Sequence, residues 1–315
     1  MRAIILGGTG AIGGATALRL ASRGWDVDVT GRHANAMPGE LRDAGVAFHA
    51  IDRADTGEIA TLMGEGAELL VDAVAYSARD VRALLPVMSS AASTVLISSR
   101  AVYVDSVGRH INGDERPRFE LPIREDNRTL PPAGDEVSPF TREGYAPSKV
   151  AAENTALDSG LPVTVIRPSK VHGRWARNPR TRSFVTRMLR GEPVIALADR
   201  GESVDHLTAA VNTAALIETV ALRPGRRILN SADPDGPTAA QIVAAVGEHL
   251  GWSGRLDLLP AGADGGEHPW HAAHPIVLDT SASLDLGYRP IGTAIELLGD
   301  EAHWCADVVR HETSG

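Results

Sequence analysis

The sequence M-R-A-I-I-L-G-G-T-G-A-I-G-G, from Met1 to Gly14, decides the fold. Ala3 to Leu6 is a short apolar run typical of a buried strand, and glycines follow it at positions 7, 8, 10, 13 and 14. Ala15 to Ser22 then carries apolar residues at helical spacing. The stretch therefore predicts a strand that ends in a tight glycine turn and leads directly into a helix.

Glycines before a helix let the backbone approach a diphosphate, whose charge the free N–H groups and the helix dipole stabilise. A second strand, Asp26 to Thr30, is expected after the helix, and this order of elements is a dinucleotide-binding fingerprint. The alternative is a tight loop between two packed elements. On the dinucleotide interpretation, the residues expected around the cofactor phosphates are Gly7, Thr9, Gly10, Ala11, Ile12 and Gly13.

Composition limits the class of protein. The 315 residues are 43% hydrophobic and 23% charged, which is enough to bury a sizeable core. A net charge of −9 repels phosphate backbones on average, so a nucleic-acid partner is disfavoured. The single Cys305 cannot form an internal disulfide, and no apolar run approaches a membrane span. We expect a soluble, cytoplasmic protein without a membrane partner.

Strand-like and helix-like segments alternate along the chain. Short β-branched or apolar runs occur at 46–51, 69–75, 94–98 and 163–167, each separated from the next by enough residues for a helix. This alternation predicts an α/β fold with a doubly wound parallel sheet of Rossmann type. Ligands of such sheets bind beyond the carboxyl ends of the strands, so the residues that follow each run are the candidates for function.

The end of the second strand usually decides which dinucleotide is bound. NAD sites place a carboxylate there for the ribose hydroxyls, but V-T-G-R-H has Gly31 at that position, followed by Arg32 and His33. A guanidinium can pair with the 2′-phosphate of NADP, so Arg32 favours NADP, with NAD as the second choice. The alternative is that Arg32 is a solvated surface charge. Asp52 is expected either to accept a hydrogen bond from the adenine amino group or to be a turn residue.

Tyr145 and Lys149 carry the expected chemistry. They lie four residues apart in Y-A-P-S-K, which opens a helical segment continuing to Ala156, so both project from one helix face. An ammonium close to a phenol lowers its pKa from about 10 and makes it a general acid or base near neutral pH. Such a pair alone is often ordinary helix surface. Ser99, at the end of the fifth strand, makes the combination specific.

These motifs resemble those of the extended short-chain dehydrogenases/reductases, in the NAD-dependent epimerase/dehydratase group, over nearly the whole chain. The resemblance rests on the glycine turn, S-S-R-A-V-Y around Ser99, Tyr145 with Lys149, V-I-R-P-S-K-V-H-G at 165–173, Asn230 in R-I-L-N, and a late L-D-L-G-Y-R-P. It implies that Tyr145 exchanges a proton with a carbinol or carbonyl oxygen that Ser99 hydrogen-bonds. It also implies that Lys149 holds the nicotinamide ribose and tunes Tyr145.

The resemblance further implies that Arg167, Pro168 and Ser169 line the nicotinamide, and that Ala75 and Tyr76 border the cofactor. We expect a dinucleotide-binding domain over residues 1–168 and a mainly substrate-binding domain over residues 169–315. As in similar proteins, some elements of the second part should return to the first domain.

Departures from the family pattern narrow the substrate. Sugar-nucleotide 4,6-dehydratases carry Asp and Glu directly after the catalytic Ser or Thr, where this chain has Arg100 and Ala101, so dehydration is disfavoured. Nucleotide-sugar enzymes usually have a diphosphate-binding arginine four residues before a histidine, and here Glu202 precedes His206. A carboxylate repels a diphosphate, so a nucleoside-diphosphate sugar is also disfavoured.

Three further segments leave alternatives open. Residues 105–144 are either a lid over the substrate or a surface excursion. The basic stretch 174–190 either docks an anionic substrate group or is a solvated helix face. The histidines in G-G-E-H-P-W-H-A-A-H-P lack a completing cysteine or carboxylate, so no metal is expected. The candidate substrate contacts are Arg100, His172, Arg174, Trp270 and His274.

The sequence therefore predicts an oxidoreductase that interconverts a secondary alcohol and a ketone on a polar small molecule. One alternative is an epimerase that oxidises and re-reduces a sugar or sugar derivative with retained cofactor. Another is a non-catalytic dinucleotide sensor, although sensors of this fold commonly lack the Tyr/Lys pair. A homodimer is expected by resemblance, through the helix that contains 145–156 and the helix after Tyr76.

Overall fold

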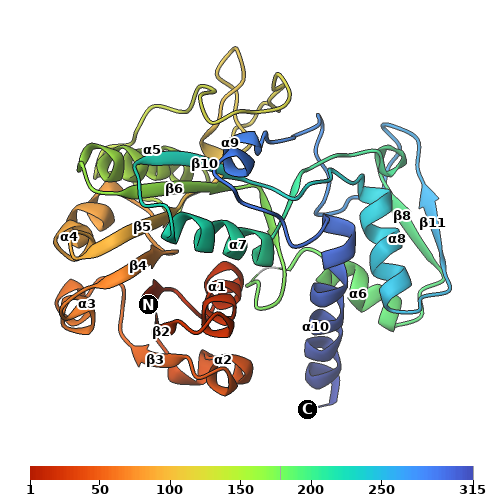
Figure 1. Ribbon diagram of the computed structural model, residues 1–315. Coiled ribbons are helices and arrows are strands. Elements are labelled where there is room, and N and C mark those ends of the chain that lie inside the picture. Colours follow the sequence, from red (N-terminus) through yellow and green to blue (C-terminus); the bar gives the residue numbers. More distant parts are fainter. Residues whose placement is uncertain (178, 315) are drawn as a thin grey trace.

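A seven-stranded parallel sheet forms the centre of the larger domain in the computed structural model, which describes residues 1–177 and 179–314 (Figure 1). The strand order is β10-β6-β5-β4-β1-β2-β3. The strands are β1 (Arg2–Leu6), β2 (Asp26–Gly31), β3 (Ala47–Ala50), β4 (Ala67–Asp72), β5 (Ala91–Ile97), β6 (Val163–Pro168) and β10 (Arg227–Ser231). The predicted doubly wound Rossmann sheet is confirmed.

Helices cover both faces of this sheet because successive strand residues point to opposite sides. Ala3 and Ile5 belong to a core formed with α1 (Ala11–Ser22), α2 (Gly39–Asp43) and α7 (Ala210–Ala221). Ile4 and Leu6 belong to a second core on the other face. The helices of that face are α3 (Thr56–Met63), α4 (Ala78–Met88) and α5 (Arg142–Asp158).

Side-chain caps explain where the predicted boundaries shifted. The run at 69–75 is strand only to Asp72, whose Oδ1 accepts hydrogen bonds from the N–H groups of Val74 and Ala75 and so turns the chain. The Tyr145 helix begins earlier than expected, at Arg142, because the Thr141 hydroxyl accepts a hydrogen bond from the N–H of Gly144. These caps bring the residues after β4 and the start of α5 to the same edge of the sheet.

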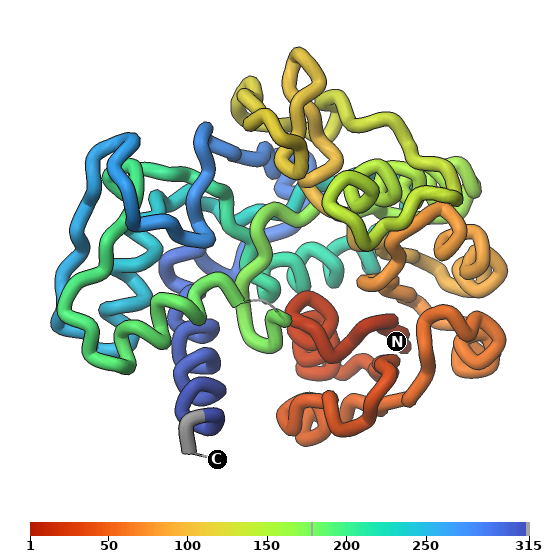
Figure 2. The backbone as a smooth tube through the Cα atoms, turned by 180° about the vertical axis from the view of Figure 1, so that it is seen from behind, coloured from red at the N-terminus to blue at the C-terminus, as the bar shows by residue number. Residues whose placement is uncertain are grey.

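The second domain lies beside the sheet and has its own core (Figures 1 and 2). A two-stranded parallel sheet of β8 (Val194–Leu197) and β11 (Arg255–Leu258) packs with α6 (Arg182–Leu189), α8 (Ala239–His249) and α10 (Ala294–Ser314). A short parallel pair, β7 (Lys170–His172) and β9 (Leu207–Ala209), leads from one domain to the other.

Three elements after residue 169 return to the large sheet and its helices. β10 pairs with β6 at the edge of the large sheet, and α7 packs against α1. The short α9 (Ser281–Asp285) packs against β10. Through these contacts, elements from the second half of the chain become part of the large sheet and of one of its helix layers.

The segment between η2 (Arg100–Val102) and α5 is irregular but packed, and it is the yellow part of the tube in Figure 2. Tyr103 and Ile123 are buried in a cluster with Ile276 and Leu278 from the second domain. The buried Asp105 carboxylate accepts hydrogen bonds from three backbone N–H groups and from an arginine side chain. The segment is therefore ordered by its packing and hydrogen bonds, although it has no regular secondary structure over most of its length.

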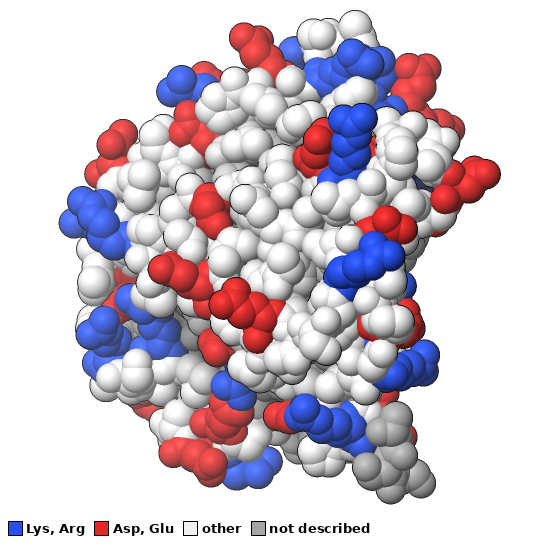
Figure 3. All heavy atoms as spheres, turned by 90° about the vertical axis from the view of Figure 1, so that its right-hand side faces the viewer, with Lys and Arg blue, Asp and Glu red and all other residues white. Residues whose placement is uncertain are grey.

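The surface of the second domain carries mixed charges. On the face in Figure 3, acidic and basic side chains are interspersed. Within the described residues, none of the helices combines the length and apolarity that crossing a bilayer requires.

Candidate active site

The glycine turn after β1 forms a cradle at the amino-terminal end of α1. Gly7 has φ +82°, which an L side chain rarely adopts, and its N–H donates to the Thr30 carbonyl oxygen 3.2 Å away. A Cβ on Gly13 would lie 2.5 Å from the Gly7 carbonyl oxygen, so helix and turn touch through backbone. Gly10 caps α1 without a side-chain hydrogen bond, and no acidic residue lies in the first turn. The first N–H groups of α1 are thus available to an anion.

A cavity of about 360 Å³ extends from this cradle along the ends of β1 to β4. Five of the predicted cofactor residues line it: Gly7, Thr9, Arg32, Asp52 and Tyr76. Gly10, Ala11, Ile12 and Gly13 form the cap and first turn of α1 beside it. Asp52 lines the cavity, and its carboxylate accepts a hydrogen bond from the Ala54 N–H at 2.9 Å. Asp52 is therefore a turn residue and also lies where a cofactor could contact it.

Phe140, Arg177 and His33 are among the lining residues of this cavity that sequence reasoning missed. Phe140 belongs to the irregular segment, and its ring centroid lies 5.3 Å from that of Tyr76. Arg177 arrives from the chain after β7, and His33 follows Arg32. Phe140 and Arg177 are distant in sequence from every dinucleotide motif, so no local pattern marks them. The V-T-G-R-H stretch could have suggested His33.

The three predicted catalytic residues meet at the carboxyl edge of the sheet. Ser99 follows β5 and caps η2, with its hydroxyl accepting a hydrogen bond from the Ala101 N–H at 3.1 Å. Tyr145, in the first turn of α5, is half-buried and hydrogen-bonded to Ser99. The Lys149 ammonium lies 6.0 Å from the centroid of the Tyr145 ring and 4.8 Å from that of Tyr76. Tyr76 thus joins the cofactor cavity to the catalytic cluster.

Lys149 is held by the backbone ends of two strands. Its ammonium donates to the Ala75 carbonyl at 2.6 Å, just after β4, and to the Ile97 carbonyl at 3.0 Å, at the end of β5. Burial lowers the pKa of Lys149 to about 8, with the nearby Asp72 carboxylate acting in the opposite direction. Ala75, expected beside the cofactor, therefore contributes through its carbonyl to Lys149.

The expected lowering of the Tyr145 pKa is wrong for the protein without a bound cofactor. Burial raises the pKa of the Tyr145 phenol, and the hydrogen bond with Ser99 offsets this only in part. The physical reason is that burial removes water from the phenolate, while the Lys149 ammonium points to two carbonyl oxygens and not to the phenol oxygen. Tyr145 is thus a protonated phenol at neutral pH.

Arg167, Pro168 and Ser169, at the end of β6, make different kinds of contact. Arg167 is buried and pairs with Glu153 of α5 at 2.6 Å, and Glu153 also accepts a hydrogen bond from Ser98. The Arg167 guanidinium is thus engaged between β6 and α5, and the expectation that this segment lines the nicotinamide stays a prediction. Pro168 ends β6. The Ser169 hydroxyl donates to the His206 carbonyl at 2.6 Å and accepts from Arg100 at 3.1 Å.

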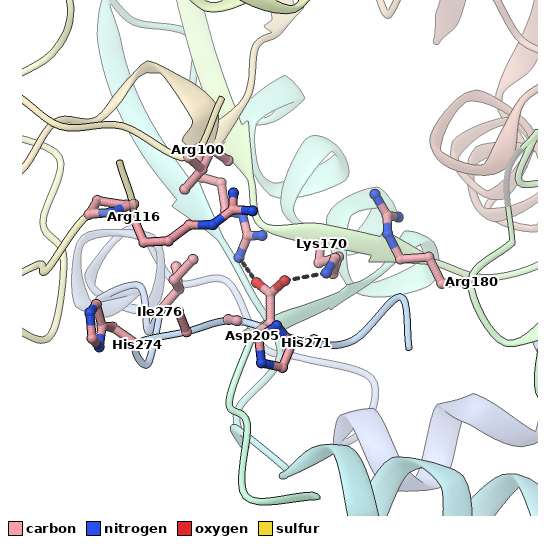
Figure 4. A pocket seen from close by; sticks show the side chains of 12 residues that line it. Arg100, Arg116, Lys170, Arg180, Asp205, His271, His274 and Ile276 are labelled. Atoms are coloured by element: carbon pink, nitrogen blue, oxygen red, sulfur yellow. Dashed lines mark hydrogen bonds and ion pairs between the residues drawn. The ribbon is translucent and has the colours of Figure 1, made fainter. Parts of the chain in front are cut away.

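A second cavity, of about 290 Å³, is lined by Arg100, which follows Ser99 in the sequence, by the irregular segment and by residues after β6 (Figure 4). Of the predicted substrate residues, Arg100 and His274 line it. Its only carboxylate among the described lining residues is the buried Asp205, paired with both Arg100 and Lys170. Its lining residues are Arg100, Ile111, Arg116, Pro117, Lys170, Arg180, Asp205, His271, Ala272, Ala273, His274 and Ile276.

Three other predicted substrate contacts lie elsewhere. Trp270 is 1% exposed and packs in the core of the second domain, because its indole fills the space between α6 and β8 neighbours. His172 is buried in a pair with Asp233 at 2.9 Å, and Arg174 pairs with Glu40 of α2. His172 and Arg174 border a different groove, between α1 and α7. None of these three residues lines the cavity that contains Arg100.

The position of Glu202 corrects the electrostatic argument against a diphosphate. Glu202 is exposed and follows η3 (Asp199–Gly201), outside the Arg100 cavity. The carboxylate in that cavity is Asp205, which two cations neutralise. Repulsion by Glu202 therefore does not restrict what binds there.

The histidine-rich stretch forms no metal-binding group in the described part of the chain. His271 pairs with Asp199 at 2.7 Å, and His268 packs between His271 and Phe184. The basic stretch also divides: Arg182 and Arg187 pair with Glu312 and Glu192 at the surface, while Arg180 faces the Arg100 cavity.

Comparisons with known proteins agree with this geometry. Residues 3–106 match the model of the NAD dependent epimerase/dehydratase family. None of the curated proteins matches the chain.

Solved structures resemble the whole chain. UDP-glucose-4-epimerase from Stenotrophomonas maltophila, with bound NAD, superposes with a TM-score of 0.73 at 18% identity and covers 99% of both chains. dTDP-glucose 4,6-dehydratase from Bacillus anthracis, in complex with NAD, gives 0.71 at 16% identity and 96% of both chains. UDP-glucose 4-epimerase from Thermotoga maritima gives 0.70 at 19% identity, over 98% of this chain and 100% of that one.

At these identities the structural likeness establishes the fold, while the family match covers the stretch that holds the glycine turn, Lys149's two carbonyl partners and Ser99. Residues 3–106 therefore resemble the NAD dependent epimerase/dehydratase family, and the whole chain shares the fold of these NAD-bound epimerase and dehydratase structures.

Proposed function

We propose that the protein is an NAD(P)-dependent oxidoreductase that interconverts a secondary alcohol and a ketone on a polar small molecule. The observation that carries the proposal is the cluster of Ser99, Tyr145 and Lys149, in which Tyr145 is hydrogen-bonded to Ser99 and the Lys149 ammonium lies 4.8 Å from the ring centroid of Tyr76, a residue that lines the dinucleotide cavity. On this proposal the substrate reaches the Tyr145 phenol from the cavity lined by Arg100.

The residues fit a dinucleotide because the turn can hold its diphosphate at the uncapped end of α1. When bound, the nicotinamide supplies or accepts the hydride. Tyr145, protonated at neutral pH, donates its proton to the carbonyl oxygen during reduction, and Ser99 hydrogen-bonds the same oxygen. Two of the three Lys149 donors are used by carbonyl oxygens, which leaves one for a ribose hydroxyl.

The raised pKa of Tyr145 leaves the cofactor-free protein with the phenol proton that reduction uses. Reduction needs a phenol that carries its proton, whereas oxidation needs a phenolate to receive one. In this protein the protonated form is the stable one at neutral pH. The pKa of about 8 for Lys149 further limits how much its charge favours the phenolate above that pH.

We further propose that NADP is preferred over NAD. Arg32 and Arg177 both line the dinucleotide cavity, and neither forms an ion pair with another described residue. Arg53, the third arginine of this cavity, is already paired with Asp72 at 2.6 Å. Two unpaired guanidiniums suit the dianionic 2′-phosphate. Arg32→Gln should weaken NADPH binding about tenfold and leave NADH binding unchanged, as measured by fluorescence titration.

The second candidate is an epimerase with retained cofactor, which the structural likeness to UDP-glucose 4-epimerases favours. Both functions use the same Tyr145, Ser99 and Lys149. They differ in whether the cofactor leaves: a reductase consumes added NADPH continuously with a carbonyl substrate, whereas an epimerase copurifies with nucleotide and shows no net turnover. Mass spectrometry of the isolated protein and an NADPH absorbance assay separate them.

The test of the catalytic proposal is Tyr145→Phe. Loss of the proton-transferring hydroxyl should lower the rate by ~10²-fold or more while the cofactor still binds. Tyr288→Phe, which removes a phenol hydroxyl buried in the core behind the sheet, is the matched control and should retain the rate. A Tyr145→Phe enzyme as active as this control would contradict the catalytic role of Tyr145, whereas a wild-type protein that binds NADPH and turns over no carbonyl substrate would favour a dinucleotide-sensing protein.

The expected homodimer through α4 and α5 remains a prediction. These two helices pack against each other on one face of the sheet, so a second copy would have to contact their outer sides. Sedimentation of the purified protein tests it.

A further inference from the structure

The cavity lined by Arg100 is strongly cationic. Four of its lining side chains are arginine or lysine, namely Arg100, Arg116, Lys170 and Arg180, and they face the single carboxylate of Asp205. This concentration of positive charge contrasts with the net charge of −9 of the whole chain.

Two of the four cations are already neutralised in part. Asp205 is buried and pairs with Arg100 on one side and Lys170 on the other, as Figure 4 shows. Lys170 also donates to the Pro269 carbonyl at 2.7 Å, and Arg100 to the Ser169 hydroxyl at 3.1 Å. This network fixes the floor of the cavity.

The other two cations have no carboxylate partner among the described residues. The Arg180 guanidinium makes one long contact, 3.5 Å, to the Val171 carbonyl, and its charge is costly there because burial lowers the pKa of this group. Arg116 comes from the irregular segment. In Figure 4, Arg116 and Arg180 lie on opposite sides of the cavity. A partly buried guanidinium that forms no ion pair with a described residue, as at Arg180, favours the binding of an anion.

We propose that this cavity binds a substrate with a compact oxyanion, a carboxylate or a phosphate ester, on a short carbon skeleton. The inference rests on the proposed function, because it takes the cavity lined by Arg100 to be the substrate site. Arg180 and Arg116 bind the oxyanion, while Ile111 and Ile276 contact the skeleton. At about 290 Å³ the cavity lies at the lower limit of small-molecule sites, so a compact anion fits it better than a nucleoside-diphosphate sugar.

Arg100 connects the cavity to the proposed catalytic residues. It directly follows Ser99 in the sequence and lines the cavity, which links the proposed oxyanion site to the proposed catalytic serine. On this proposal the ketone belongs to the same small molecule as the charged group. A neutral ketone of equal size would leave Arg180 without a partner and bind weakly.

Calorimetric titration of the NADPH-saturated protein tests the inference, with three probes: inorganic phosphate, succinate and UDP-glucose. We expect phosphate or succinate to bind, and the stronger of the two identifies the class of oxyanion. Arg180→Gln and Arg116→Gln should each weaken that binding about ten- to hundredfold. Arg42→Gln on α2, outside the cavity, removes the same charge and should leave the binding unchanged.

Several outcomes would overturn the inference. The inference fails if neither phosphate nor succinate binds. It also fails if the Gln variants bind these anions as tightly as the wild type does, or if the substitutions weaken the binding of UDP-glucose alone. Arg116 is exposed in an irregular segment, so its variant should fold even if Arg180→Gln does not. If NADPH binds and the small anions do not, the oxidoreductase proposal stands and only this inference fails. If NADPH itself does not bind, the proposed function fails first.

Discussion

Gly13 is where the cofactor cradle tolerates no side chain, and Gly13→Ala should therefore destabilise the protein. A Cβ at this position would lie 2.5 Å from the Gly7 carbonyl oxygen, 2.8 Å from the Gly8 Cα and 3.1 Å from the Gly7 carbonyl carbon. All three atoms are backbone, so no side-chain rotation relieves the overlap. The turn or the first turn of α1 must move.

The expected size of the effect follows from two opposing contributions. Forcing an extra methyl group into a packed site costs about 1–3 kcal/mol. Replacing a helical glycine by alanine returns about 0.5–1 kcal/mol through the lower entropy of the unfolded chain. Subtracting the gain from the cost leaves a net destabilisation of about 0–2.5 kcal/mol, centred on about 1 kcal/mol, or roughly 2–4 °C in the midpoint of thermal unfolding.

Gly10→Ala is the matched control. A Cβ on Gly10 has the Gly7 carbonyl oxygen at 3.9 Å as its nearest neighbour, and Gly10 has an ordinary φ of −91°. Thermal unfolding of the wild type and both variants, followed by circular dichroism without cofactor, gives the comparison. If Gly13→Ala unfolds at the same temperature as Gly10→Ala, the backbone contact between turn and helix does not constrain the fold as argued.

Three further predictions concern residues around the site. Glu153→Leu leaves the buried Arg167 without its partner and should cost about 3–5 kcal/mol in urea unfolding; a loss below about 1 kcal/mol would contradict the role of this pair. Burial alone would lower the pKa of His172, but pairing with Asp233 outweighs it and raises this pKa. The pair therefore contributes its full stabilisation below the unfolded-state pKa of about 6.5. This contribution is lost as the pH rises through the pKa of His172 in the folded protein. His172→Gln should thus destabilise more at pH 6 than at pH 9, and equal losses at the two pH values would refute this. Phe140→Ala removes an 80% exposed ring and should change stability by less than about 0.5 kcal/mol but weaken NADPH binding several-fold, unless Phe140 does not contact the bound cofactor.

Local patterns in the sequence determined the architecture. The run from Ala3 to Leu6 forms a strand buried on both faces, and the glycines after it force a turn that few other residues permit. Helical spacing likewise placed Tyr145 and Lys149 on one face of α5. Such features depend on neighbours within a few residues, so they can be predicted from the sequence alone.

Tertiary structure decided the electrostatics and the lining of the cavities. Helical spacing alone could not tell that Lys149 points to the carbonyls of Ala75 and Ile97, which is why the Tyr145 pKa rises where a decrease was expected. Motif alignment likewise assigned a repelling carboxylate to Glu202, but folding turns that residue to solvent and buries Asp205 between two cations. A pKa and a cavity wall depend on burial and on groups 50 to 100 residues away, and a linear pattern carries neither.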